Sequence, residues 1–200
     1  VSSLLSNTFI SHLFAESVDK NRSFLKEKVG DKITNLTMID DGTIDYGVAS
    51  ANFDGDGNPT KRNVVLENGV LKGFLYDDFY GKKFGVESTG NSERDYKSLP
   101  SIGTTNFIIE GEKIEGIKKG FIINELRGAH TANPISGDFS VEISSGFYIK
   151  NGEKVHPIKH GMIAGNVFEF LSKVKGVYGE VKNTGGMITS SVVSEAKVVG

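Results

Sequence analysis

FSVEISSGFYIKNGEKVHPI, residues 139–158, decides the fold class, because β-branched and aromatic runs flank the pair Asn151-Gly152. Apolar and polar residues alternate in the first run, as they do in a half-buried strand. A two-residue type I′ turn needs positive φ at both central residues, and Asn-Gly is its favoured sequence. The stretch therefore predicts an antiparallel hairpin.

The same signal occurs earlier in the chain. NVVLENGVLKGFLYD, residues 63–77, places Asn68-Gly69 between two alternating apolar segments. Beyond Gly42, most of the 25 glycines lie between short runs rich in Val, Ile, Phe and Tyr, which is the spacing of turns that join strands. A sheet-dominated chain is expected.

Helical signals are fewer. Leu5, Phe9 and Leu13 recur at helical spacing, and no Gly or Pro occurs before Gly30, so residues 2–17 predict an N-terminal amphipathic helix. Three further short helices are expected at Asp77–Gly85, Lys113–Lys119 and Asn166–Val174. The predicted class is α+β, with a mainly antiparallel sheet that is sandwich-like or barrel-like. Without an internal repeat or linker, residues 1–200 are expected to form a single domain.

Composition excludes several classes of function. Lys and Arg (23) nearly balance Asp and Glu (25), and no basic block occurs, so nucleic acid is not an expected partner. The apolar runs are too short to span a membrane. The absence of cysteine excludes a disulfide framework and a thiolate metal site and fits a cytoplasmic location. Because the chain begins at Val1, we expect it to be part of a longer natural protein.

His12 and Glu16 are the first candidate metal ligands. They lie four residues apart, so on a continuous helix their side chains would share one face. Two ligands do not make a zinc site, and Leu13 stands where a catalytic glutamate would activate water. The alternative is that His12 borders the apolar stripe and Glu16 is solvated, which the sequence favours.

Two other stretches imitate metal sites. FDGDGNPTKRNV, residues 53–64, has oxygen-bearing side chains at calcium-loop spacing, but Pro59 occupies the glycine position and Val65 the position of the closing glutamate. A polar turn is expected instead. His156 and His160 lie in an extended segment, which places them roughly 13 Å apart, so they cannot share a metal.

Residues 129–140, AHTANPISGDFS, gather the side-chain types of a hydrolytic triad in His130, Ser136 and Asp138. Triads are defined by geometry, and no Gly-x-Ser-x-Gly elbow surrounds the serine. Asn-Pro and Ser-Gly-Asp favour turns for backbone reasons, so a turn is the preferred interpretation.

Taken in order, several segments resemble the carboxy-terminal part of the TldD/PmbA family, also called the modulator of DNA gyrase family. After the opening segment with His12, the matching stretches are IDDGTID (39–45), VVLENGVLKGFLYD (64–77), STGN (88–91), TNFIIEGE (105–112), SGDFSVEISSGFYIKNGEKVHPI (136–158), IAGN (163–166) and NTGG (183–186). The resemblance covers nearly the whole chain.

The resemblance implies a metallopeptidase ancestry. TldD-type members look like zinc peptidases with a His-Glu-x-x-x-His helix and a late cysteine ligand, whereas PmbA-type (TldE) members lack a working metal site. Here His12 matches the first histidine, but Leu13 replaces the glutamate, Ser17 the second histidine and Gly185 the cysteine. Leucine and glycine offer no ligand or base, and serine is a poor zinc ligand. The resemblance therefore implies a PmbA/TldE-type chain in which neither catalytic residues nor bound zinc is expected.

The leading functional expectation is a non-catalytic subunit that pairs with a TldD-type peptidase and helps to form a channel for extended peptides. One alternative is an active zinc-dependent peptidase with a rebuilt site, in which His130 or His160 joins His12 and Glu16. The other is a self-associating binding protein.

Overall fold

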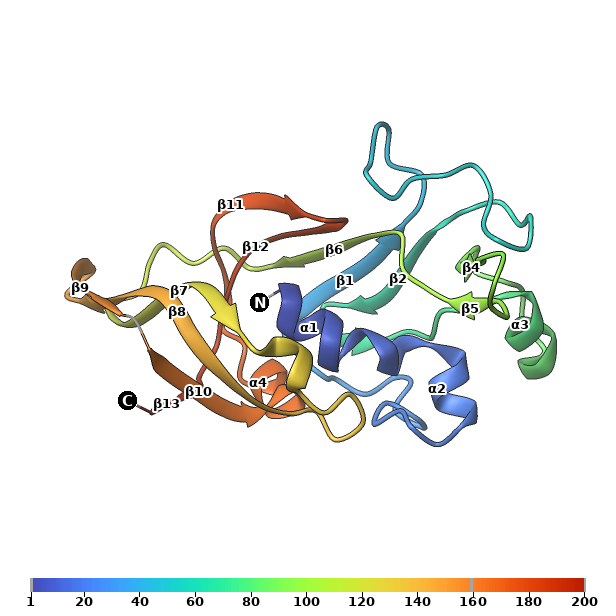
Figure 1. The fold of residues 1–200 in the computed structure, drawn as a ribbon. Helices are drawn as coiled ribbons and strands as arrows, with labels where there is room; N and C mark the ends of the chain where they lie inside the picture. Colours follow the sequence, from blue (N-terminus) through green and yellow to red (C-terminus); the bar gives the residue numbers. More distant parts are fainter. Residues whose placement is uncertain (1, 159, 200) are drawn as a thin grey trace.

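The computed structural model describes residues 2–158 and 160–199 (Figure 1). The strands are β1 Leu36–Asp41, β2 Arg62–Glu67, β3 Val70–Leu71, β4 Ser92–Glu93, β5 Ser101–Ile102, β6 Asn106–Gly111, β7 Lys119–Arg127, β8 Asp138–Lys150, β9 Glu153–Ile158, β10 Gly161–Asn166, β11 Gly176–Thr184, β12 Met187–Val193 and β13 Lys197–Val199. The helices are α1 Ser2–Thr8, α2 Ala15–Asp19, α3 Asp78–Phe84 and α4 Val167–Ser172, with 3₁₀ turns η1 Ile10–Leu13 and η2 Ala129–Thr131.

The described strands form two main sheets and a small ribbon, β4–β5. The six-stranded sheet has the order β11-β12-β6-β1-β2-β3, in which only β12 and β6 run parallel. The five-stranded sheet is built on the long strand β8, which pairs with β7 on one side and with β9 and β10 on the other, while β13 pairs with β10. Neither sheet closes on itself, so the α+β, mainly antiparallel class is confirmed and the barrel-like alternative is excluded.

Both predicted Asn-Gly hairpins are present. Asn68 and Gly69 have φ of 49° and 84° between β2 and β3, and Asn151 and Gly152 have φ of 55° and 84° between β8 and β9. Left-handed φ at both central residues is the signature of the type I′ turn. Both Asn-Gly pairs therefore form the turns that the sequence predicted.

The expected continuous helix over residues 2–17 is wrong. The segment divides into α1, η1 and α2, because Phe14 adopts an extended conformation with ψ of 131°. Around it, the Leu75 amide donates to the Leu13 carbonyl at 2.8 Å and the Ala15 amide donates to the Leu75 carbonyl at 3.0 Å. These bonds to a distant segment replace the helical ones, which periodicity alone could not predict.

The expected helix at Lys113–Lys119 is also wrong. The Ile114 amide donates to the Val177 carbonyl at 2.9 Å, and the Val177 amide donates to the Glu112 carbonyl at 2.8 Å, so this segment extends along the sheet before β7 begins. The other two short helices are confirmed. Asp77 and Asn166 cap α3 and α4 by accepting hydrogen bonds from backbone amides, as N-cap side chains do.

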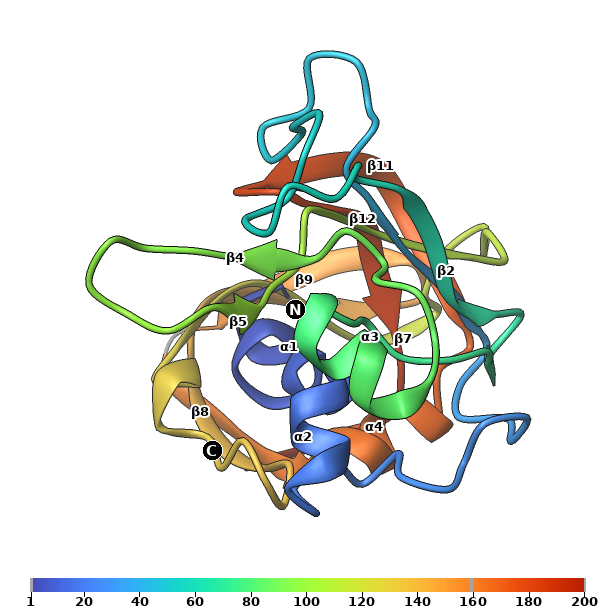
Figure 2. The same cartoon turned by 90° about the vertical axis from the view of Figure 1, so that its right-hand side faces the viewer.

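The helix α1 lies between the two main sheets (Figures 1 and 2). Leu5 packs in the larger apolar core with residues of the six-stranded sheet, the N-terminal helices and α4. Its neighbour Leu4 packs in a second core with residues of β8, β10 and η2. The N-terminal segment that carries the degenerate motif is therefore held in the middle of the molecule.

Candidate functional site

His12 is completely buried on η1. Its Nδ1 atom accepts a hydrogen bond from the Phe24 amide at 3.0 Å, and its ring packs edge-to-face on Phe168 with centroids 4.9 Å apart. Burial lowers the pKa of His12 below its ordinary value, although the Pro134 backbone opposes the shift. Because Nδ1 accepts from an amide it carries no proton, so His12 is a neutral core histidine. Nε2 meets no partner at hydrogen-bond geometry within the described chain, although the Pro134 backbone is close enough to affect the pKa.

The positions that flank His12 in the motif serve packing. Leu13 is fully buried in the larger core, where it lies in the place of the missing general base. Ser17 is partly buried on α2, and its carbonyl accepts hydrogen bonds from the amides of Arg22 and Ser23 as the helix ends. Neither position offers a metal ligand of ordinary strength.

Glu16 does not join His12. Its carboxylate pairs with Lys20 and raises the pKa of that ammonium group. Burial and the charge of Glu16 both raise the pKa of Tyr80 on α3. The ion pair between Asp19 and Lys83 at 2.7 Å holds α2, which carries Glu16, against α3. His12 instead contacts Phe168 on α4. The extended Phe14 between them breaks the shared helical face that the sequence predicted.

Gly185 lies in the turn between β11 and β12, with φ of 61°. A Cβ atom there would meet no other atom within 4 Å, so the position is open, but its backbone conformation favours glycine. The adjacent Gly186 amide donates to Asn183 at 3.1 Å, and the Gly186 carbonyl accepts from the Phe107 amide at 2.7 Å. None of these residues is a described contact of His12.

The residues at the four motif positions, together with Glu16, do not fit a zinc ion. His12 has one nitrogen engaged, Glu16 is paired with a lysine, and Leu13, Ser17 and Gly185 supply no strong donor. Across residues 2–158 and 160–199, no group of three His, Cys, Asp or Glu side chains is arranged to hold a metal.

The remaining histidines make no described contact with His12. His160 Nδ1 lies 2.9 Å from Glu142 Oε1 on an exposed surface, and His130 is exposed on η2. His156 lies on β9 opposite Tyr148. The described contacts bring neither His130 nor His160 against His12, and they do not favour the rebuilt zinc site.

The triad-like loop is a turn. The Ser136 hydroxyl donates to Asp138 at 2.7 Å, and the Asn166 amide group donates to the other Asp138 oxygen at 2.9 Å. These hydrogen bonds lower the pKa of Asp138. The serine is bonded to a carboxylate and not to His130, so the loop lacks the nucleophile–base contact that catalysis requires.

The calcium-like stretch is also a turn. Asp54 accepts from the backbone amides of Asp56, Asn58 and Ser92 at 3.0, 2.9 and 3.1 Å, and Arg94 donates to Asp56 at 2.7 Å. The carboxylates therefore hold the turn against β4, which agrees with the preference for a polar turn.

Sequence reasoning missed a buried polar network that joins three of the quoted motifs. Asp40, 1% exposed, accepts from the Thr105 amide and from Asn91, both at 2.6 Å, and burial raises its pKa. Asn63 donates to Asn91 at 3.2 Å, and Asn106 donates to the Asp41 carbonyl at 2.8 Å. IDDGTID, STGN and TNFIIEGE thus meet at one end of β1 and β6. The Asp and Asn residues of these three motifs were the feature of the sequence that could have indicated the network.

The polar network positions two exposed loops. Asn106 accepts from the Ala49 amide at 3.1 Å and donates to the Ser50 hydroxyl at 2.8 Å, which orders residues 42–61. The second loop joins β4 to β5 and meets the first through the contacts of Asp54 and Asp56. Large apolar side chains are exposed on both loops, namely Tyr46, Val48, Phe53, Tyr96 and Leu99. We call this surface the loop end.

Fold and site together define an α+β chain with two open sheets, whose N-terminal segment carries His12 in the core with Leu13 and Ser17 at the neighbouring motif positions. The family model for the PmbA/TldA metallopeptidase C-terminal domain matches residues 1–200. The chain therefore belongs to the TldD/PmbA family and corresponds to its C-terminal domain.

Individual relatives agree with this assignment. An uncharacterised protein of Methanocaldococcus jannaschii is 44% identical and matches 98% of this chain over 48% of its own length. A metalloprotease TldD homologue of Buchnera aphidicola is 32% identical, matching 84% of this chain over 36% of its own length. The chain thus spans about half the length of the first relative and 36% of the length of the second.

Two solved structures share the fold. TldE from Thermococcus kodakarensis has a TM-score of 0.87 and 34% identity, covering 98% of this chain and 47% of its own. A protein from Thermotoga maritima described as a putative modulator of DNA gyrase has a TM-score of 0.88 and 36% identity, covering 98% and 46%. Among the described residues, no helix is long and apolar enough to cross a membrane.

Proposed function

We propose that this chain is the C-terminal domain of a non-catalytic, PmbA/TldE-type subunit that associates with a metal-bearing TldD-type peptidase. The observation that carries the proposal is the environment of His12 and Leu13 in the N-terminal segment. His12 is buried with Nδ1 occupied, and Leu13 fills the core in place of a base. A residue set that cannot hold zinc or activate water cannot perform metal-dependent hydrolysis itself.

Family membership supports the peptidase partner, because its members include chains named metalloprotease and chains named TldE. The loop end supplies exposed apolar side chains of the kind that protein interfaces use. The open sheet edges could accept extended peptide by backbone hydrogen bonding. The absence of cysteine fits a cytoplasmic assembly.

The test begins with zinc content, measured by elemental analysis on protein purified without chelators or a histidine tag. We expect far less than one zinc per chain and no peptidase activity from the protein alone. Adding a TldD-type peptidase from the same organism should restore or raise proteolysis, and the two proteins should co-purify.

A variant pair separates the rebuilt-site alternative from the proposal. His12→Asn removes the imidazole but keeps an acceptor near the Phe24 amide, and His156→Asn changes an exposed histidine that the rebuilt site does not use. Stoichiometric zinc that disappears only in His12→Asn, together with loss of turnover, would refute the non-catalytic role. Native complexes that contain only copies of this protein would support the self-associating alternative instead.

A further inference from the structure

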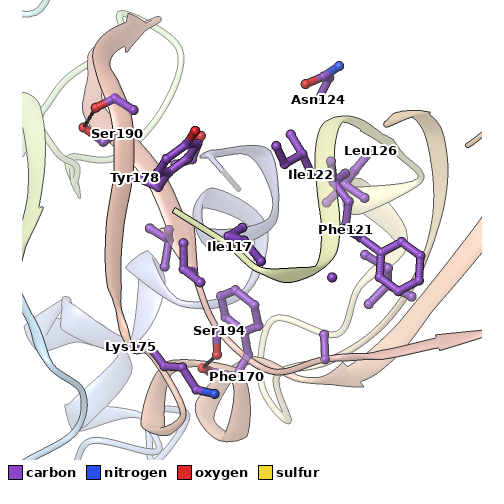
Figure 3. A pocket seen from close by; sticks show the side chains of 18 of the residues that line it. Ile117, Phe121, Ile122, Asn124, Leu126, Phe170, Lys175, Tyr178, Ser190 and Ser194 are labelled. Carbon is purple, nitrogen blue, oxygen red and sulfur yellow. Dashed lines mark hydrogen bonds between the residues drawn. The ribbon is translucent and has the colours of Figure 1, made fainter. Parts of the chain in front are cut away.

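The strands β7 and β11 border one groove. Each is the outermost named strand of its sheet, although residues 112–114 pair with β11 at Val177. The groove between β7 and β11 has a volume of about 1150 Å³. Figure 3 shows Tyr178 on the β11 side, Ile122 and Leu126 on the β7 side, and Ile117 and Phe170 between them. Outermost strands carry unpaired backbone N–H and C=O groups, which are a template for another strand.

The edge of β7 itself faces this groove. Residues 118–124 line it without a gap, although alternate side chains of a strand point to opposite faces of its sheet. A continuous run of lining residues therefore indicates that the edge of the strand borders the space. In the described chain β7 pairs only with β8, so its outer hydrogen-bonding groups are open to a ligand.

The walls of the groove are mainly apolar and come from both sheets and from α4. They include Ile114, Ile117, Ile122, Leu126, Phe139, Val141, Ile163, Phe170 and Val192. Side chains of this type bury one face of an added strand. Because these walls offer few polar partners, they do not favour a hydrophilic ligand deep in the groove.

The charge of the lining selects the kind of peptide. Five lysines border the groove, against Glu180 and Glu195, and Lys175 pairs with Glu195 at 2.8 Å. The four other lysines, for which the described chain shows no ion pair, are Lys118, Lys119, Lys154 and Lys182. The whole chain has a net charge of −2, so the positive charge is a local property of the groove.

We infer that the β7–β11 groove binds an extended peptide in which apolar and acidic residues alternate, added as a strand to β7. This inference rests on the proposed function and assigns a substrate class to the subunit. Apolar side chains of the peptide enter the groove, and its carboxylates face the lysines at the rim. Period-two alternation places the two kinds of side chain on opposite faces of the peptide.

The binding test uses fluorescence anisotropy with the protein at the length its gene encodes. The probe is a labelled nine-residue peptide of alternating Val and Glu, because β7 has nine residues. Analogues with Gln or Lys in place of Glu are the matched controls. We expect the Glu peptide to bind about tenfold or more tightly than the Lys peptide, with the difference reduced by salt.

Charge reversal locates the site. Lys119→Glu with Lys182→Glu changes one exposed lysine on each side of the groove, and this double variant should lower the affinity for the Glu peptide about tenfold. Lys26→Glu with Lys32→Glu makes the same charge change at exposed lysines that do not line the groove. This control should bind like the unmodified protein, and equal losses in both variants would overturn the assignment.

Backbone methylation tests strand addition. N-methyl groups placed along one edge of the peptide should abolish binding, while the same number along the other edge should leave it intact, since only one edge pairs with β7. Equal effects would overturn the binding mode. If the gene-length protein binds no peptide, and β7 resists hydrogen exchange in its absence, another part of the protein or a second copy fills the groove and the inference fails.

Failure of the inference differs from failure of the proposed function. A protein that stimulates a TldD-type peptidase but shows the same peptide affinity in both lysine variants would keep its proposed role and lose the groove assignment. A protein that binds the acidic peptide but associates with no peptidase would retain the binding site and refute the proposed function, including the role of the peptide as a substrate.

Discussion

At the residue scale, His12 is held by contacts that require its neutral form. Its Nδ1 atom must be unprotonated to accept from the Phe24 amide at 3.0 Å. Protonation would place two N–H donors face to face inside a buried site, where charge is costly. The residue therefore contributes a packing and hydrogen-bonding role that depends on its neutral form.

This dependence predicts acid sensitivity. The folded-state pKa of His12 lies below its ordinary value of 6.5 because of burial, so the unfolded chain binds the proton more readily. The contribution of His12 to stability is complete above about pH 6.5 and is lost as the pH falls through the folded-state pKa. Urea midpoints measured from about pH 8 to about pH 5 should decline more steeply for the unmodified protein than for His12→Asn.

His130→Asn is the control for this prediction, since His130 is exposed on η2. Its profile should run parallel to that of the unmodified protein. A slope that survives unchanged in His12→Asn would mean that other groups cause the acid sensitivity.

At the scale of elements, the two Asn-Gly hairpins place the same type I′ turn in two different packing environments. The turns share sequence and φ, with Gly69 and Gly152 both at 84°. They differ in packing. A Cβ on Gly69 would lie 1.7 Å from the Thr34 carbonyl oxygen, whereas a Cβ on Gly152 would meet nothing within 4 Å. The first turn has no room for a Cβ atom. The second has room, although its Gly152 amide donates to the Lys118 carbonyl at 3.1 Å.

Alanine substitutions at the two glycines should therefore have unequal effects. Gly152→Ala should lower the free energy of unfolding by about 1–2 kcal/mol, the general penalty for a left-handed non-glycine residue. Gly69→Ala should lower it by a further ~2–3 kcal/mol, because the Thr34 segment must move. Urea unfolding of the two variants measures the difference, and equal losses would show that this segment yields without strain.

At the scale of the whole molecule, α1 connects the two sheets. Leu5 is 1% exposed in the core of the six-stranded sheet, and Leu4 is 4% exposed in the core beside β8 and β10. Adjacent residues on one short helix thus pack against different sheets. Loss of either contact should be felt by both sheets, because each sheet uses the same helix as packing surface.

We expect Leu4→Ala and Leu5→Ala each to lower stability by ~2–5 kcal/mol, the range for buried leucines. Each variant should still unfold in one transition. Native-state hydrogen exchange of β8 and β1 tests this, since both strands should lose protection together. Loss of protection confined to β8 in Leu4→Ala would instead show that the sheets unfold as separate units.

Local chemistry explains what could be predicted from the sequence. The Asn-Gly turns, the Asp77 and Asn166 caps and the alternating strands follow from short-range backbone preferences, and the mainly antiparallel α+β class follows from their number and order. The expectation that Leu13, Ser17 and Gly185 replace zinc-site residues likewise needed no coordinates, because it came from the resemblance of the sequence to the family.

Contacts between distant segments decided the rest. Helical periodicity was overruled at Phe14, where Leu75 supplies hydrogen bonds from another part of the chain, and at Lys113–Lys119, where Val177 does the same. The polar network around Asp40 and the groove between β7 and β11 also depend on pairings between strands far apart in sequence. The sequence determined which local structures could form and which residue types stand at the motif positions. Only the tertiary structure decided where His12 is buried and which sheet edges stay open, because those properties depend on neighbours that no local pattern specifies.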